Sequence, residues 1–84
     1  MEPPHPRDAG FAALNADDCT TALAEFDRAV AQDRADPLAA YGRGVARHRL
    51  GEHEAALDDL DRAVRLGAGD DARRYRVHAH RALS

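Results

Sequence analysis

Histidines are the first residues of this 84-residue sequence to examine for chemistry, because imidazole binds metals and transfers protons near neutral pH. His48 and His53 stand on either side of Gly51, and His78 and His80 lie two positions apart. Two histidines can hold one metal ion on a helix when they are four positions apart, whereas residues two apart point to different sides. We therefore expect no metal site, and we interpret His48 and His53 as packed or solvated side chains.

Cysteine and carboxylate side chains offer no clearer chemistry. Cys19 is the only cysteine, which excludes a disulfide within the chain, and its place early in a helical pattern favours a packed residue over a reactive thiol. Asp58, Asp59 and Asp61 form a carboxylate run of the kind that covers solvated helix faces. There is no Gly-rich phosphate loop, nucleophile elbow or HExxH motif, so the sequence predicts a protein that is not an enzyme and uses no cofactor.

The charge balance points to neither nucleic acid nor membrane. Lys and Arg number 12 against 15 Asp and Glu, which gives a net charge of -3. No apolar run approaches the roughly 20 residues of a membrane-spanning helix. The first ten residues have no signal-peptide core, so we expect a cytoplasmic protein without a membrane partner.

The stretch 36–69 contains the elements around which the chain is arranged. Asp36 and Pro37 are an N-cap residue and the residue favoured at the first helical position, so a helix should begin there and end near Gly51. A second helix should follow and end near Gly67. Its apolar positions recur at helical spacing, and they are Ala56, Leu57, Leu60, Ala63 and Val64.

This helix pair recurs in the sequence. A shift of 34 positions places Gly10 on Gly44, and Asp36 on Asp70. The same shift superposes Ala22 on Ala56, Leu23 on Leu57, Phe26 on Leu60, Ala29 on Ala63 and Tyr41 on Tyr75. Such self-similarity at a fixed period, with helix, turn and helix in each unit, is typical of a stacked solenoid.

We therefore predict an all-α fold, an α-solenoid of stacked antiparallel helix hairpins with about five helices. The first repeat should cover about residues 3–36, the second about 37–70, and a terminal half-repeat helix 71–84. Three prolines in residues 1–6 predict an extended lead-in, with disorder as an alternative, before a helical domain over residues 7–84.

The chain resembles tetratricopeptide repeat proteins. In the central copy the resemblance rests on Arg43, Gly44, Ala46, Leu50, Gly51, Ala56, Leu57, Leu60, Ala63 and Val64. The small residues among them, Gly44, Ala56 and Ala63, let two helices approach closely. The sequence departs from the family pattern at Ala40, Arg47 and Ala68 in the second copy, and at Ala9 and Asp17 in the first.

The resemblance implies different roles for the two helices of each repeat. In the family, first helices line a concave groove and second helices form the convex back. The groove positions implied here are Arg7, Phe11, Leu14, Tyr41, Val45, His48, Arg49, Tyr75, Ala79 and Ala82. The packing positions implied are Ala22, Leu23, Phe26, Ala29, Gly44, Gly51, Ala56, Leu57, Leu60 and Ala63.

Charges are segregated by helix type. Acidic residues concentrate on the second helices, and arginines on the first helix of the central copy and the last helix; these arginines are Arg43, Arg47, Arg49, Arg73, Arg74, Arg76 and Arg81. One interpretation is a groove of positive character that favours an acidic ligand. The other is that the charges pair between neighbouring helices.

The last helix also allows two interpretations. Its apolar stripe, Ala72, Tyr75, Ala79 and Ala82 with Leu83, follows the groove-facing positions, whereas the positions expected to pack inward include Arg74, His78 and Arg81. Either the apolar face is exposed and supports self-association or occupancy of the groove by a partner, or a shift in helix phase buries it.

The resemblance implies a non-catalytic adaptor that binds a peptide or protein segment, with acidic character, in the groove. Phe11 and Val45 stand where members that clamp chaperone tails need Asn, so that activity is not expected. Two alternatives stay open: self-assembly, such as a homodimer, through the incomplete third repeat, and nucleic-acid binding through the Arg-rich last helix, which the acidic second helices disfavour.

Overall fold

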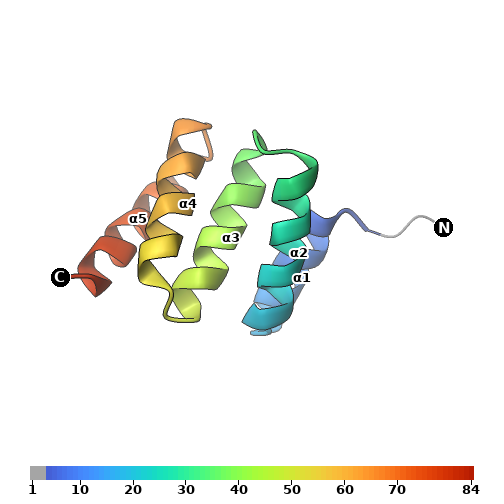
Figure 1. The fold of residues 1–84 in the computed structure, drawn as a ribbon, viewed down its shortest axis with the longest axis horizontal. Coiled ribbons are helices and arrows are strands. Elements are labelled where there is room, and N and C mark those ends of the chain that lie inside the picture. Colours follow the sequence, from blue (N-terminus) through green and yellow to red (C-terminus); the bar gives the residue numbers. More distant parts are fainter. Residues whose placement is uncertain (1–3) are drawn as a thin grey trace.

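Five helices and no strand make up residues 4–84, the part of the chain that the computed structural model describes. They are α1 (Pro6–Asn15), α2 (Cys19–Gln32), α3 (Pro37–Arg49), α4 (His53–Arg65) and α5 (Asp70–Ala82) (Figure 1). This confirms the predicted all-α fold. The lead-in expected over residues 1–6 lies partly outside the described residues, and α1 begins within it, at Pro6.

Side-chain caps and left-handed residues set the ends of the helices. The Asp36 carboxylate accepts hydrogen bonds from the backbone N–H groups of Leu38 and Ala39, at 3.0 and 3.4 Å, and so caps α3. Gly51 closes the α3–α4 turn with a φ of 86°. Asp17 takes the equivalent place after α1 with a φ of 59°, a conformation that Asp tolerates better than most residues. The turn between helices therefore keeps its geometry although the glycine is absent.

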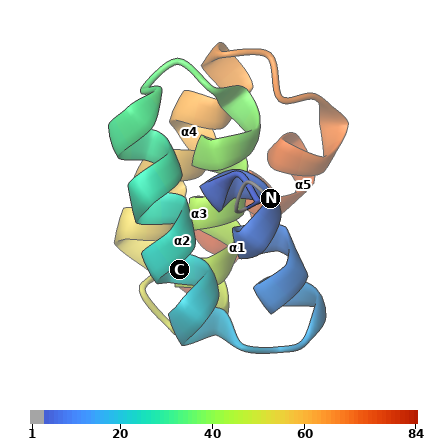
Figure 2. The same cartoon turned by 90° about the vertical axis from the view of Figure 1, so that its right-hand side faces the viewer.

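The helices form an elongated stack, 46 × 24 × 19 Å, in which each helix packs on the next along the chain. In addition α1 contacts α3, and α3 contacts α5, so the odd-numbered helices form one layer. Figure 2 looks along the stack and shows α2 and α4 on one side and α1 and α5 on the other. The hairpins thus lie side by side in the same orientation.

Glycines let two large side chains fill the core. Phe26 and Leu60 are the largest fully buried side chains. Gly10 on α1 and Gly42 on α3 both lie against the Phe26 ring, where an added methyl group would overlap it. Gly44 lies in the same way against Leu60. The helices can approach this closely only because these positions carry no side chain.

The residues expected to pack the repeats lie at helix contacts. Six of them are fully buried, and these are Ala22, Phe26, Ala29, Ala56, Leu60 and Ala63. Leu23 and Leu57 are half-buried, whereas Gly51 is exposed and serves the turn.

The last helix buries the larger part of its apolar stripe. Ala72 and Ala79 are 0% exposed, and Tyr75 is half-buried, whereas Ala82 and Leu83 at the end of the stripe are exposed, as are Arg74, His78 and Arg81. The interpretation in which the stripe faces solvent is therefore wrong for Ala72 and Ala79. The physical reason is that α5 packs on both α4 and α3, which turns its small residues inward.

Candidate functional site

A row of aromatic rings crosses the layer of odd-numbered helices. Phe11 on α1, Tyr41 on α3 and Tyr75 on α5 follow one another, with ring centroids 6.3 Å apart for the first pair and 5.9 Å for the second. All three side chains are half-buried, so each ring is anchored and still reaches solvent. We call these three residues the aromatic row. It joins three helices that are distant in sequence.

The core beneath supports the row. The Phe11 ring meets the buried Phe26 ring edge-on at 4.9 Å, and Tyr41 and Tyr75 pack against a cluster that contains Val45. Val45 and Ala79, which share the register of Phe11 in their repeats, are only 3% and 0% exposed. A partner cannot reach these two short side chains. Although both were expected in the groove, they pack the core and offer no contact surface.

The other residues expected in the groove differ in their exposure to solvent. Leu14 is buried, Ala82 is exposed, and Arg7, His48 and Arg49 keep part of their side chains accessible.

Arg49 lies beside the row near Tyr75. Its Nη1 donates a hydrogen bond to the Leu14 carbonyl at 3.3 Å and lies 3.7 Å from the Asp17 carboxylate. Interaction with the Tyr75 side chain raises the pKa of the Arg49 guanidinium above its usual range. The Arg49 side chain is 39% exposed and that of Asp17 is 94% exposed, so the ion pair between them is a weak surface pair.

Arg7 is more firmly engaged than Arg49. Its Nη1 donates to the Asp36 carboxylate at 2.8 Å, and that carboxylate is also the cap of α3. Arg7 therefore ties α1 to the start of α3.

Three of the six other arginines of the odd-numbered helices pair with carboxylates of the even-numbered ones. Asp59, which is 4% exposed, accepts from Arg43 at 2.8 Å and from Arg47 at 2.9 Å. Arg43 also reaches Asp27 on α2 at 3.4 Å, and Arg76 lies 3.7 Å from Asp61. The interpretation that charges pair between neighbouring helices holds for Arg43, Arg47 and Arg76. The guanidinium groups of these three residues are thus less available to an acidic ligand.

Two histidines, His48 and His53, contact each other beside Tyr75 of the aromatic row. The Nδ1 atoms of His48 and His53 are 3.0 Å apart, which requires one ring to donate and the other to accept. His48 also meets Tyr75 at 6.2 Å between centroids, and Tyr75 meets His78 at 6.0 Å. Burial lowers the pKa of His48, and the positive charges of His53, His78 and Arg49 lower it further. The positions of two histidines on either side of a tight turn are the one feature of the sequence that points to this contact.

Two further observations concern sites that were considered from the sequence. Cys19 is half-buried and packs against the same core cluster as Phe11. Within residues 4–84, no three His, Cys, Asp or Glu side chains come together in a way that could hold a metal ion.

Helix length bears on membrane insertion. Over the same described residues, none of the five helices combines the length and the apolar character that crossing a membrane requires.

Comparison with known proteins agrees with the geometry. The family model for the tetratricopeptide repeat matches residues 7–71, which is more than half of the chain. No curated protein and no solved structure is significantly similar to this chain. The chain therefore belongs to the tetratricopeptide repeat family, a family of protein–protein interaction modules, and carries about two and a half repeats.

Proposed function

We propose that this protein is a non-catalytic adaptor that binds an extended segment of another protein across the aromatic row. The observation that carries the proposal is the row itself, because three half-buried rings from three helices offer a continuous apolar strip at the surface. Aromatic side chains with one buried and one exposed edge are the usual anchors of protein interfaces.

The spacing of the rings favours an extended ligand. Neighbouring centroids are 6.3 and 5.9 Å apart. Alternate side chains of an extended peptide lie on one face about 6.6 Å apart. Side chains at positions i, i+2 and i+4 of such a segment can therefore meet Phe11, Tyr41 and Tyr75 in turn.

The hydroxyl group of Tyr41 stays neutral when a ligand lies on the aromatic row. Burial raises the pKa of Tyr41 above its usual range, and electrostatic interactions with Tyr75 and Asp71 add to this effect. The ring can thus present both an apolar face and an uncharged hydrogen-bonding group to a ligand.

Arg49 supplies the preference for an acidic group. Its carboxylate partner, Asp17, is almost fully exposed. The Arg49 Nη1 and Asp17 Oδ1 atoms are 3.7 Å apart, which is too long for a hydrogen bond. A carboxylate on the bound segment can replace it at little cost, because a weakly held surface pair contributes little. Arg7 contributes less, since its strong contact with Asp36 is already part of the fold.

Selection from a random peptide library displayed on phage tests this proposal. We expect the selected peptides to combine an apolar side chain with Asp or Glu. Their affinity should fall by about 30-fold or more in the variant Tyr41→Ala with Arg49→Glu, the effect of losing a 2 kcal/mol anchor.

The control for this experiment changes charge on another face. Arg65→Glu, on the exposed side of α4, alters the net charge by the same amount as Arg49→Glu and should leave affinity unchanged. If the selected peptides bind the double variant as tightly as the parent protein, the aromatic row is not the binding site.

The two alternative functions have less support. Burial of Ala72 and Ala79 leaves Val77 on α5 and Leu83, the residue directly after it, as large exposed apolar side chains at this end of the described chain. Arg73 and Arg76 of the same helix each have a carboxylate within 3.7 Å, which reduces the charge available to a phosphate backbone. Multi-angle light scattering at high concentration tests self-assembly directly.

A further inference from the structure

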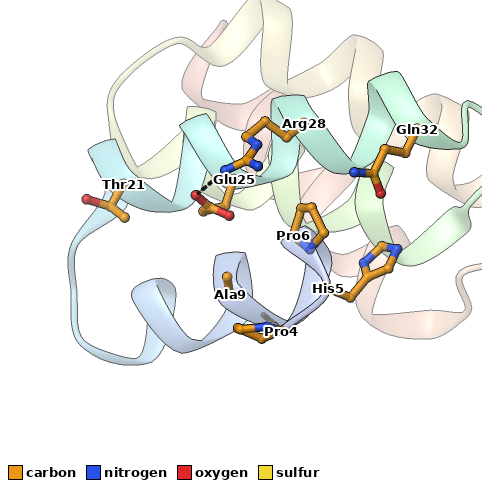
Figure 3. Close-up of a pocket in the computed structure, with 8 residues that line it drawn as sticks. All are labelled: Pro4, His5, Pro6, Ala9, Thr21, Glu25, Arg28 and Gln32. Atoms are coloured by element: carbon orange, nitrogen blue, oxygen red, sulfur yellow. Dashed lines mark hydrogen bonds and ion pairs between the residues drawn. The ribbon is translucent and has the colours of Figure 1, made fainter. Parts of the chain in front are cut away.

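A hollow of about 660 Å³ lies between α1 and α2. It is separate from the aromatic row, because Ala9 and Phe11 are two positions apart and leave α1 on different sides. Its walls are Pro4, His5, Pro6, Ala9, Thr21, Glu25, Arg28 and Gln32. In Figure 3 the Glu25 carboxylate lies between Arg28 on its own helix and Ala9 on α1.

The second repeat provides an internal comparison for this hollow. The shift of 34 positions that relates the repeats carries Glu25 to Asp59 and Ala9 to Arg43. The two hairpins pack in the same register, because a methyl group added at Gly10 would meet Phe26 at 2.7 Å and one added at Gly44 would meet Leu60 at 2.7 Å. Equivalent residues therefore occupy equivalent places.

The comparison shows which partners Glu25 lacks. In the second repeat, Asp59 is bonded by Arg43 through Nε at 3.1 Å and Nη2 at 2.8 Å, and by Arg47 at 2.9 Å. In the first repeat these two arginines are replaced by alanines, Ala9 and Ala13.

Glu25 is left with a single weak ion pair. Its side chain is only 23% exposed, and among the described residues its one cationic partner is Arg28, at 3.4 Å. Arg28 itself is 67% exposed, so this pair contributes little. A half-buried carboxylate thus borders an open volume at the place where the second repeat holds a guanidinium.

We propose that this hollow is a binding site for an arginine side chain presented by another polypeptide. The incoming guanidinium takes the place that Arg43 has in the second repeat and bonds the Glu25 carboxylate, while its aliphatic stem lies over Pro6 and Ala9. Arginine fits better than lysine because its planar fork makes the paired contacts that Arg43 makes with Asp59.

Arg28 does not prevent this arrangement. Asp59 accepts from two arginines at once, so a carboxylate at this register has oxygen atoms for both Arg28 and a ligand. The site takes a cationic group and lies apart from the aromatic row, so it is independent of the function proposed above.

Filling the hollow from within the chain is the first test. Ala9→Arg should rebuild the contact of the second repeat and raise the melting temperature, and Glu25→Gln should cancel that gain. Ala12→Arg, at an exposed position of the same helix, is the matched control and should give no gain that depends on Glu25.

Binding of a blocked five-residue peptide with one central arginine, followed by NMR, is the second test. We expect amide shifts at Thr21, Glu25 and Arg28, and affinity lower by about tenfold when citrulline replaces arginine, because the charge-assisted pair is lost. Glu25→Gln and Ala9→Arg should each abolish the shifts, whereas Ala12→Arg should keep them.

The outcomes separate this site from the aromatic row. The variant Tyr41→Ala with Arg49→Glu should bind the arginine peptide normally. Equal binding of the arginine and citrulline peptides, unchanged binding by Ala9→Arg, or an absence of shifts around Glu25 would each overturn the proposal.

Discussion

His48 is a residue whose neighbours decide its charge. It contacts His53 through Nδ1 at 3.0 Å and lies near Tyr75, and the other charged groups that lower its pKa are His78 and Arg49. Protonation of His48 is therefore disfavoured by burial and by the positive charges of up to three neighbouring side chains. The neutral form is the one that the folded structure favours.

Stability should consequently fall in mildly acidic solution. The folded pKa of His48 lies below the unfolded value of about 6.5, so the unfolded chain takes up the proton first as the pH falls. The contribution of His48 is fully present above pH 6.5 and is lost as the pH falls through its folded pKa. Thermal melts of the parent protein should show this loss, and His48→Gln should flatten it.

His80→Gln provides the control for this measurement, because His80 is exposed on α5. It should leave the pH dependence of the parent protein intact. A melting temperature that falls equally with pH in the His48→Gln variant would show that other groups cause the effect.

The last helix, α5, is held to the stack by its packing against two other helices. This helix has no hairpin partner among the described residues and is held by α4 and, less extensively, by α3. Ala72 and Ala79 are its fully buried residues, and Ala72 shares a cluster with Ala40 and Ala63. Small side chains thus set the distance at which α5 packs.

Ala79→Asp should detach α5 or cost about 2–4 kcal/mol, because it places a carboxylate in a fully buried site. Trypsin should then cut at the arginines of α5 much faster than in the parent protein. Val77→Asp makes a similar change at a position that is 49% exposed, and should cost less than about 0.5 kcal/mol. Equal protease sensitivity of the two variants would contradict this packing of α5.

Stability is expected to be uneven over the whole molecule. The stack is built from neighbouring contacts, and α3 is the one helix that contacts all four others. In repeat proteins of this kind each unit is stabilised by its neighbours, so the ends open more readily than the centre. Among the residues that the structure describes, the largest fully buried side chains are those of Phe26 and Leu60, and so small a core favours a low melting temperature.

Hydrogen exchange should reveal this gradient. Amides in the middle of α3 should exchange at least about tenfold more slowly than those in the middle of α1 and α5, because the latter can open without disrupting the rest of the stack. Exchange at one common rate in all five helices would show that the molecule unfolds as a single unit instead.

The sequence by itself determined the helices and their order. Asp36 with Pro37, the glycines after α3 and α4, and the spacing of Ala56, Leu60 and Ala63 are local signals, and each acts within a few residues of the chain. The repeat of 34 positions then predicted a stack, since equal units pack in equal ways. These features required no knowledge of distant contacts.

The tertiary structure alone decided which side chains reach the surface and which charges are paired. Successive residues on a helix turn by about 100°, so a small change of phase exchanges buried and exposed positions. Side-chain length matters as well, because Val45 and Ala79 share the register of Phe11, yet their short side chains are buried while the Phe11 ring reaches solvent. The pairing of Arg43 and Arg47 with Asp59, and the contact between His48 and His53, arise where α3 meets α4, and a pattern read along one helix does not contain them.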